Sequence, residues 1–401
     1  MKLKTIALAT LAACGFAGAA QAQISGDVIK IGMLTDLSGV YADIDGSGGV
    51  EAVKMAIADM KGMVAGKKIE FIYADHQNKA DVASAKAREW FDTQGVDMLI
   101  GGTNSGTALA MATVAAEKHK PFIVIGAGSA RLTNEACTPY TIHYAYDTVA
   151  LARGTVNPMV KAGGKSWYFL TADYAFGASL QGDATEVVQK AGGKVVGSVK
   201  HPLNASDFSS FLLQAQGSGA QILGLANAGG DTINSVKAAN EFGITKSMKL
   251  AGLLMFIADV HSLGLKAADG MYLTDSWYWN QSPEAREWSR RYFEKMKRMP
   301  TSLHAADYSA VTNYLKAVEA IKTDDGDKVM AKLKSTPLKD FYSSGNIRKE
   351  DGRYVHDMFL MQVKSPKESI EPWDYLKVVT RIPGNEAYTQ LAESKCPLVK
   401  K

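Results

Sequence analysis

The sequence predicts an α/β protein of two Rossmann-like lobes, each built on a parallel β-sheet, joined by a hinge with a cleft between them. Apolar strands alternate with helical patterns of about 10 to 15 residues along most of the chain, which is typical of βαβ units. An irregular stretch at 127–146 separates two such series. The length of 401 residues is enough for two lobes of ordinary size.

Each expected element rests on its own apolar pattern. Short apolar runs predict strands, and apolar residues at helical spacing predict helices. In the first series we expect strands at 28–34, 67–74, 96–101 and 121–126, and helices at 50–60, 81–94 and 105–119. In the second series we expect helices at 148–162, 177–191, 206–217 and 231–243, and strands at 166–172, 194–200, 220–226, 248–254 and 270–275.

Two further helices are expected late in the chain, at 283–297 and 303–322, followed by short strands within 344–364. These helices need a sheet to cover, so the chain is expected to cross between the lobes more than once. We therefore place one lobe at 23–145 plus about 279–350, and the other at 146–278 plus about 351–390, with a tail at 391–401.

The N-terminus has the pattern of an export signal. A basic "MKLK" precedes an apolar run at 5–19, and "AQA" at 20–22 is a small-x-small cleavage site. The sequence favours a signal peptide over 1–22, cleavage after Ala22 and a periplasmic location. The alternative is a lipoprotein attached at Cys14, because "LAAC" at 11–14 is similar to a lipobox.

Two cysteines, Cys137 and Cys396, remain after cleavage. An even pair in an oxidising compartment favours a disulfide, which would tie the C-terminal tail to a distant loop. Two unpaired thiols are the alternative.

Composition and motifs argue against several classes of function. The net charge of +4 comes without a dense basic tract, so no nucleic-acid partner is expected. The sequence has no phosphate-binding loop, no nucleophile elbow and no metal-binding pattern, so we expect no enzyme, no metal and no cofactor. A secreted hydrolase using Ser105 or Ser129 is the alternative; it requires a nearby histidine, and only His143 is close in sequence.

Three turns that leave strands of the first series are rich in Gly, Ser, Thr and Asn: 35–49, which contains Tyr41, 101–107 and 126–133. In a parallel sheet such turns share one edge, where backbone N–H groups can bind a carboxylate. The second series offers aromatic and apolar residues at its own edge. The candidates there are Tyr146, Phe176, Asn227, Asp231 and Met255, and Tyr174 belongs to the same turn as Phe176.

Several motifs together resemble a known family: "IKIGMLTDLSGVYADIDGSGGVEAVKMAIADM", "LIGGTNSGTALA", "PFIVIGAGSARLT" and "FLTADYAFGASL". They are similar to the type I periplasmic solute-binding proteins of ABC importers, in the branch of leucine/isoleucine/valine-binding proteins. The resemblance covers nearly all of the chain after the signal. It implies two lobes with three crossovers, closure on a small ligand, and an ABC permease as partner of what we expect to be a monomer.

The resemblance also implies roles for individual residues. The ligand carboxylate would be held by Asn104, Ser105, Ala127, Gly128 and Ser129, and Phe176 would cover the ligand. Amino-acid binders of the family hold the ligand ammonium with an acidic residue that follows the strand reading "LAGLLMF" here. No Asp or Glu lies between Leu250 and Ile257.

A buried ammonium without a carboxylate partner is costly. We therefore expect an aromatic acid of the benzoate or cinnamate type, or a keto acid. The alternative is a branched-chain amino acid, urea or an amide, with Asp231 engaging the amine.

Overall fold

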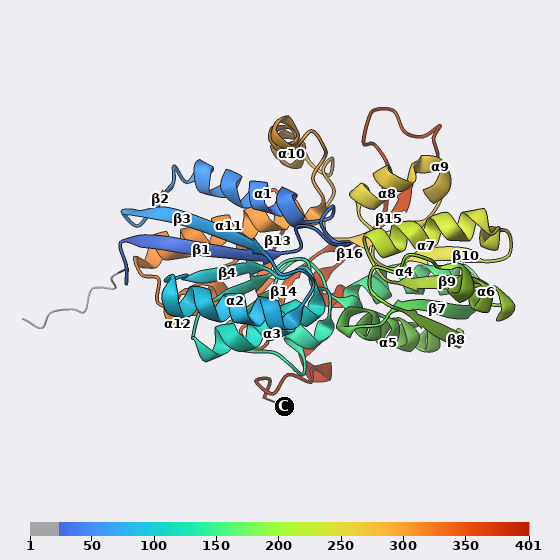
Figure 1. Cartoon of the computed structure of the whole chain (residues 1–401), viewed down its shortest axis with the longest axis horizontal. Coiled ribbons are helices and arrows are strands. Elements are labelled where there is room, and N and C mark those ends of the chain that lie inside the picture. The colour runs from blue at the N-terminus through green and yellow to red at the C-terminus, as the bar shows by residue number, and fades with distance from the viewer. Residues whose placement is uncertain (1–23, 401) are drawn as a thin grey trace, which may run out of the picture.

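The computed structural model of the chain describes residues 24–400. The predicted signal peptide, its cleavage site and Cys14 lie outside these residues. Two α/β lobes with parallel sheets lie side by side, as Figure 1 shows, so the predicted fold class is confirmed.

A six-stranded sheet forms the first lobe, in the order β2-β3-β1-β4-β5-β6, and only its edge pair β2-β3 is antiparallel. The strands are β1 (Val28–Thr35), β2 (Met63–Val64), β3 (Lys67–Asp75), β4 (Met98–Gly101), β5 (Phe122–Val124) and β6 (Thr141–His143). The helices of this half are α1 (Gly46–Asp59), α2 (Ala80–Thr93), α3 (Ser105–Glu117), α10 (Pro283–Met296), α11 (Ser302–Ile321) and α12 (Gly326–Ser335).

The two faces of this sheet carry separate apolar cores because successive strand residues point to opposite sides. Ile31 and Met33 of β1 belong to the core that includes α1 and α11. Leu34 belongs to the core of α2 and α3, together with Trp90 and Phe122. The late helix α11 therefore does return to the first sheet.

A four-stranded parallel sheet forms the second lobe, in the order β10-β9-β7-β8. Its strands are β7 (Ser166–Ala172), β8 (Lys194–His201), β9 (Ile222–Ala226) and β10 (Lys249–Gly252). Its helices are α4 (Thr148–Lys161), α5 (Ala175–Lys190), α6 (Ser209–Gly217), α7 (Gly230–Glu241), α8 (Ile257–Leu263) and α9 (Leu265–Ala268).

The chain passes between the lobes three times: between β6 and α4, between β11 (Tyr272–Asp275) and α10, and between β14 (Tyr354–His356) and β15 (Met358–Val363). Two small antiparallel sheets accompany these crossings, one of β12 (Leu338–Lys339), β13 (Ser344–Ile347) and β14, the other of β11, β15 and β16 (Leu376–Ile382). The fully buried Arg353 joins two crossings, donating to the carbonyls of Tyr146 (2.9 Å) and Tyr144 (2.6 Å).

The tail returns to the first lobe after α13 (Gly384–Ala387) and is bonded there. Cys137 and Cys396 form a disulfide across 259 residues, which confirms the predicted pair. On the way, Arg153 of α4 donates to the carbonyl of Tyr388 (2.7 Å). The tail thus contacts both lobes.

Helix α1 begins four residues earlier than expected, so the glycine-rich stretch at 46–49 is its first turn. Glycine is favoured in this turn by close packing, since a Cβ at Gly48 would lie 2.3 Å from the hydroxyl oxygen of Tyr292 on α10. Strand β6 and the short helices α8 and α9 were also not expected, because the apolar residues of their segments show no clear strand or helix periodicity.

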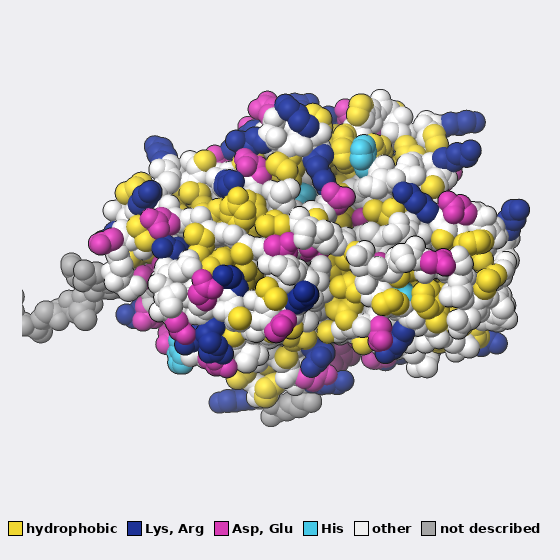
Figure 2. Space-filling view, viewed as in Figure 1, with side chains coloured by type: hydrophobic (Ala, Val, Ile, Leu, Met, Phe, Trp, Pro, Cys, Tyr) yellow, Lys and Arg dark blue, Asp and Glu magenta, His cyan; other side chains and the backbone are white. Residues whose placement is uncertain are grey.

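Charged side chains of both signs are interspersed over the face shown in Figure 2. This agrees with a nearly balanced composition of 45 Lys and Arg against 41 Asp and Glu.

Candidate ligand site between the lobes

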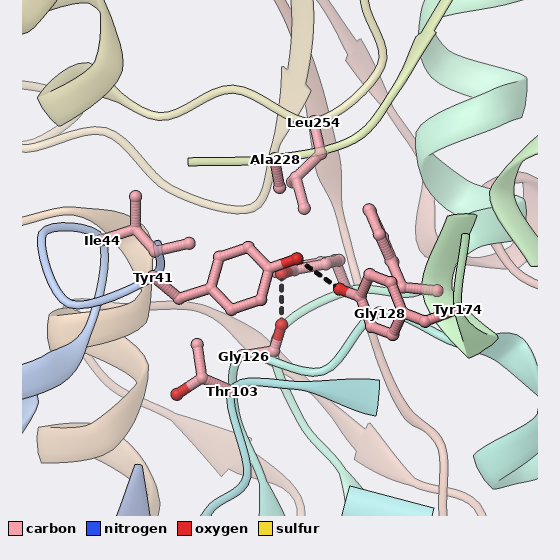
Figure 3. Close-up of a pocket in the computed structure, with 10 residues that line it drawn as sticks. Tyr41, Ile44, Thr103, Gly126, Gly128, Tyr174, Ala228 and Leu254 are labelled. Carbon is pink, nitrogen blue, oxygen red and sulfur yellow. Dashed lines mark hydrogen bonds between the residues drawn. The ribbon is translucent and has the colours of Figure 1, made fainter. Parts of the chain in front are cut away.

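A small cavity lies between the lobes, at the carboxyl ends of the strands of both parallel sheets. Ligands of open α/β sheets bind at this edge. Figure 3 shows side chains from both lobes converging on it. The lining consists of Tyr41, Ile44, Thr103, Gly126, Gly128, Tyr146, Tyr174, Phe176, Ala228 and Leu254.

Three tyrosines supply the phenolic hydroxyl groups of this lining. Tyr41 follows β1, Tyr174 precedes α5 in the other lobe, and Tyr146 lies in the first crossing. The hydroxyl oxygens of Tyr41 and Tyr174 are 2.5 Å apart, and the Tyr146 hydroxyl donates to the carbonyl of Gly126 at 2.5 Å (Figure 3). Because the Tyr41–Tyr174 pair has two protons and uses one, a second proton is available to an acceptor.

Burial raises the pKa of all three phenols above the usual value. For Tyr41 the nearby Tyr174 adds to this effect, and for Tyr146 the charge of Asp275 does. The hydroxyls therefore remain protonated donors at neutral pH.

Backbone N–H groups of the turn after β5 complete the polar surface. Among the hydrogen bonds of residues 24–400, none is donated by the N–H of Gly126, Ala127 or Gly128. All three residues are buried, and buried N–H groups are normally paired. Two of them, at Gly126 and Gly128, belong to the cavity lining and are suited to a ligand oxygen.

The lobes approach closely beside the cavity. Gly230 donates its N–H to the carbonyl of Val40 (3.0 Å), which joins the turn after β9 to the turn after β1. Gly229 has a φ of 57°, and a Cβ there would lie 2.4 Å from the Val40 oxygen. Only glycine fits this contact without strain.

The Periplasmic binding protein family matches residues 28–368. The chain belongs to this family.

Solved structures of similar proteins cover almost the whole chain. A periplasmic binding protein from Burkholderia mallei is 65% identical, with a TM-score of 0.92 over 93% of this chain and 100% of that one. A branched chain amino acid ABC transporter periplasmic ligand-binding protein from Burkholderia xenovorans is 38% identical, with a TM-score of 0.82 over 93% and 100%. A Rhodopseudomonas palustris solute binding protein in complex with 3,4-dihydroxy benzoic acid shares the fold, with 24% identity and a TM-score of 0.81 over 93% and 99%.

As a periplasmic binding protein, the chain is a solute-binding component of ABC transport, and its family is exported to the periplasm. Such proteins bind their solutes without transforming them. Within residues 24–400, no helix is both long and apolar enough to cross a bilayer. The same residues contain no group of three or more His, Cys, Asp or Glu placed to hold a metal ion.

Four of the residues singled out in the sequence lie in the cavity lining: Tyr41, Gly128, Tyr146 and Phe176. Phe176 lies beside Gly128, since a Cβ on that glycine would be 2.9 Å from the Phe176 ring. Their contact with a ligand remains a prediction.

The predicted carboxylate-binding side chains of the first lobe lie behind the lining and are engaged with one another. Asn104 caps α3 by accepting from the N–H groups of Gly106 (2.8 Å) and Thr107 (3.3 Å). The Ser105 hydroxyl accepts from the N–H of Ser129 at 3.1 Å. Asn104, Ser105, Ala127 and Ser129 lie outside the cavity lining, and their contact with a ligand remains a prediction.

The three second-lobe candidates Asn227, Asp231 and Met255 also lie outside the lining. Asp231 accepts from the N–H groups of Asn204 (3.0 Å) and Ala205 (3.1 Å), so its carboxylate is already hydrogen-bonded to backbone. Asn227 accepts from the Thr232 hydroxyl at 2.8 Å. The neighbour of Met255, Leu254, takes the lining position instead.

Sequence reasoning omitted Ile44, Thr103, Gly126, Ala228 and Leu254 from the candidates, and it did not carry Tyr174 forward as a site residue. Ile44, Thr103 and Gly126 lie in turns that the sequence had singled out, so those turns were recognised before the individual residues. Ala228 follows an expected strand, and Leu254 ends another. Which residue of a turn faces the cavity depends on backbone geometry, which composition does not reveal.

A nucleophilic serine is not supported by the geometry. The His143 side chain is fully buried, and its Nε2 is 2.7 Å from the carbonyl oxygen of Ala127. The Ser129 hydroxyl is paired with that of Ser179 at 2.7 Å. Among the described residues, neither Ser105 nor Ser129 is hydrogen-bonded to a histidine.

Proposed function

We propose that this periplasmic binding protein takes up a small carboxylate that lacks an ammonium group, an aromatic acid or a keto acid, and delivers it to an ABC permease. One observation carries the proposal: none of the ten lining residues has a charged side chain. An α-amino acid would bury its ammonium there without a carboxylate partner, which is expensive.

The donors of the lining suit an anion. The unpaired N–H groups of Gly126 and Gly128 and the second proton of the Tyr41–Tyr174 pair are available to carboxylate oxygens. Preorganised neutral donors in a buried site stabilise a negative charge without a lysine or arginine.

The walls favour a small, flat or apolar ligand body. The cavity has a volume of about 10 Å³, which is close to that of a single water site, so even a small ligand requires the lobes to part. Phe176, Ile44 and Leu254 supply apolar surface opposite the donors. The Rhodopseudomonas palustris protein, which binds 3,4-dihydroxy benzoic acid, has the same fold.

The second candidate is a branched-chain amino acid, as the name of the 38% identical Burkholderia xenovorans protein suggests. This alternative requires a partner for the ammonium. Asp231 is the acidic residue expected from the sequence for this role, but its carboxylate is bonded to two backbone N–H groups. Urea or an amide is a further alternative, which would require only neutral hydrogen-bond partners. The ligand screen described next tests it as well.

The test is a thermal-shift screen of refolded, ligand-free protein, followed by calorimetric titration of every hit. Matched pairs make it sharp: leucine against its keto acid, and phenylalanine against phenylpyruvate, together with benzoate, urea and acetamide. A ligand at 100 times its Kd adds about 2.7 kcal/mol to the free energy of unfolding.

We expect shifts with amine-free acids and none with their amino-acid partners. Shifts with leucine, but not with its keto acid, would overturn the proposal in favour of the second candidate. Shifts with urea or acetamide alone would overturn it as well.

A further inference from the structure

Two buried carboxylates lie together behind the wall of the cavity. Asp45 immediately precedes α1, and Asp307 lies on α11; both are fully buried. A Cβ built on Gly49 would lie 2.2 Å from Oδ1 of Asp45 and 2.6 Å from Oδ2 of Asp307. The two carboxyl groups therefore face the same small space over Gly49.

The hydrogen bonds of the pair are incomplete. Oδ2 of Asp45 accepts from the hydroxyls of Thr35 (2.8 Å) and Thr103 (2.7 Å). Oδ1 of Asp45 and both carboxylate oxygens of Asp307 have no donor among residues 24–400. A proton held between the two carboxyl groups would satisfy the facing oxygens.

Within residues 24–400, no cation is bonded to either carboxyl group. The Nε2–H of His304 donates to the backbone carbonyl of Asp45 (3.0 Å), and burial lowers the pKa of His304 to about 3, so it is neutral. Tyr292 of α10 bonds the other ring nitrogen of His304 (3.0 Å). Two further charged groups act on this region: Asp36, which is another acid, and Arg298, which pairs with Asp43.

Two adjacent buried carboxylates cannot both be ionised at ordinary cost, so such a pair retains a proton. In agreement, burial and the Asp45 charge raise the pKa of Asp307 well above its usual value. Burial also raises the pKa of Asp45, although the threonine hydroxyls act in the opposite direction.

The pair is coupled to the cavity through segment 36–45. Asp36 accepts from the N–H of Tyr41 (3.0 Å), and Asp45 donates its own N–H to the Tyr41 carbonyl (3.3 Å). Tyr41 and Ile44 of this segment line the cavity, as does Thr103, whose hydroxyl is bonded to Asp45. A shift of Asp45 away from α11 would therefore move three lining residues.

We propose that Asp45 and Asp307 are positioning residues that share one proton, and that this proton holds segment 36–45 in the geometry that binds ligand. Removing the proton leaves two negative charges facing each other, which pushes the segment away from α11. The effect on ligand affinity rests on the proposed function above, but the effect on the segment does not.

The first experiment needs no ligand. Hydrogen exchange of the peptide covering 36–45 is followed by mass spectrometry between about pH 5 and about pH 9 in wild type and in Asp307→Asn, whose amide can donate to Asp45 at any pH. Between the ordinary carboxyl pKa of the opened segment, about 4, and the raised pKa of the closed pair, each pH unit should increase opening of the segment about tenfold in wild type relative to Asp307→Asn, and above that range the ratio should stay constant. Asp45→Asn provides a second neutral pair if the first variant fails to fold.

Asp183→Asn is the matched control. Asp183 is a half-buried residue of α5 whose carboxyl pKa is raised to about 7 by desolvation, and its Oδ2 also lacks a hydrogen bond among the described residues. It lies outside the cavity lining. Exchange of the 36–45 peptide in this variant should follow the wild-type pH profile. Identical profiles in wild type and Asp307→Asn would overturn the proposal.

The second experiment measures the Kd for benzoate and phenylpyruvate over the same pH range. The Kd of the wild type should increase at high pH, whereas that of Asp307→Asn should stay constant. A parallel increase in both proteins would overturn the positioning role. If the wild type binds no amine-free acid, the proposed function fails, while the exchange profiles still decide whether the proton is shared.

Discussion

The hydroxyl oxygens of Tyr41 and Tyr174 lie 2.5 Å apart, although the two residues belong to different lobes. Together with the Gly230–Val40 hydrogen bond, this contact joins the lobes directly beside the cavity. The same hydroxyls serve as candidate ligand donors, so closure and binding depend on the same atoms.

Tyr174→Phe should weaken ligand binding about tenfold, which corresponds to about 1.4 kcal/mol, because it removes one hydroxyl from this pair and keeps the ring. Calorimetric titration with the best acid from the ligand screen provides the measurement. If Tyr174→Phe binds the acid with the wild-type affinity, the hydroxyl pair is not part of the binding surface.

Tyr168→Phe is the control for this change. Tyr168 is a buried tyrosine of β7 in the same lobe, outside the cavity lining, and its hydroxyl has no hydrogen bond among the described residues. Its loss should leave the affinity unchanged.

Gly229→Ala should block closure of the lobes. Its φ of 57° disfavours alanine by about 1 kcal/mol, and the new Cβ would meet the backbone oxygen of Val40 at 2.4 Å. A backbone atom cannot swing aside as a flexible side chain can, so the lobes must separate. We expect a loss of affinity of at least about tenfold and a larger radius of gyration in the presence of ligand, measured by small-angle scattering.

Gly182→Ala is the matched substitution, because a Cβ at this position of α5 has nothing within 4 Å. It should retain wild-type affinity and gain up to about 1 kcal/mol of stability from helix propensity. Equal affinities for the two alanine variants would contradict the closure argument.

The alternation of apolar runs and helical patterns was enough to predict both parallel sheets. Strand β1 and helix α2 illustrate why: an apolar run and a helical period are local signals. The early start of α1 was not predictable in the same way. Gly48 packs against Tyr292, which is more than 240 residues away in sequence, and glycine alone indicates a turn more often than a helix.

The candidate site was predictable to the level of turns, not of atoms. Asn104 and Ser105 open a helix, as expected from "GGTNSGTALAM". The Asn104 side chain caps this helix by accepting a hydrogen bond from a backbone N–H of its first turn. Ser105 is likewise engaged by the Ser129 N–H. Hydrogen bonds between such neighbours compete with a ligand, and the outcome depends on three-dimensional geometry. The Asp45–Asp307 contact joins segments far apart in sequence, so no local pattern signals it.

Reducing the Cys137–Cys396 disulfide should lower stability by about 2–4 kcal/mol, because the bond closes a long loop in the unfolded chain. Chemical unfolding with and without reductant measures the difference. The double variant Cys137→Ser/Cys396→Ser should match the reduced protein and show no response to reductant. Ligand affinity should change little, since neither cysteine lines the cavity. An equal stability of oxidised and reduced wild type would contradict this prediction.

Asp275→Asn should alter how stability depends on pH. Asp275 ends β11 at the second crossing between the lobes, and burial raises its pKa to about 7 from 3.8. Between these two values the folded protein retains a proton that the unfolded chain has lost, so rising pH favours unfolding. The free energy of unfolding of the wild type should therefore fall, relative to the variant, by about 1.4 kcal/mol per pH unit between about pH 4 and about pH 7.

Above about pH 7 the carboxyl is ionised in both states, so the stability curves of wild type and Asp275→Asn should run parallel. Denaturant titrations at unit pH intervals give both regions in one series, and the upper region serves as the internal control. Curves that are parallel throughout would show that Asp275 is ionised in the folded protein. A steeper fall in the variant would have the wrong sign, because an asparagine at this position holds no proton to lose.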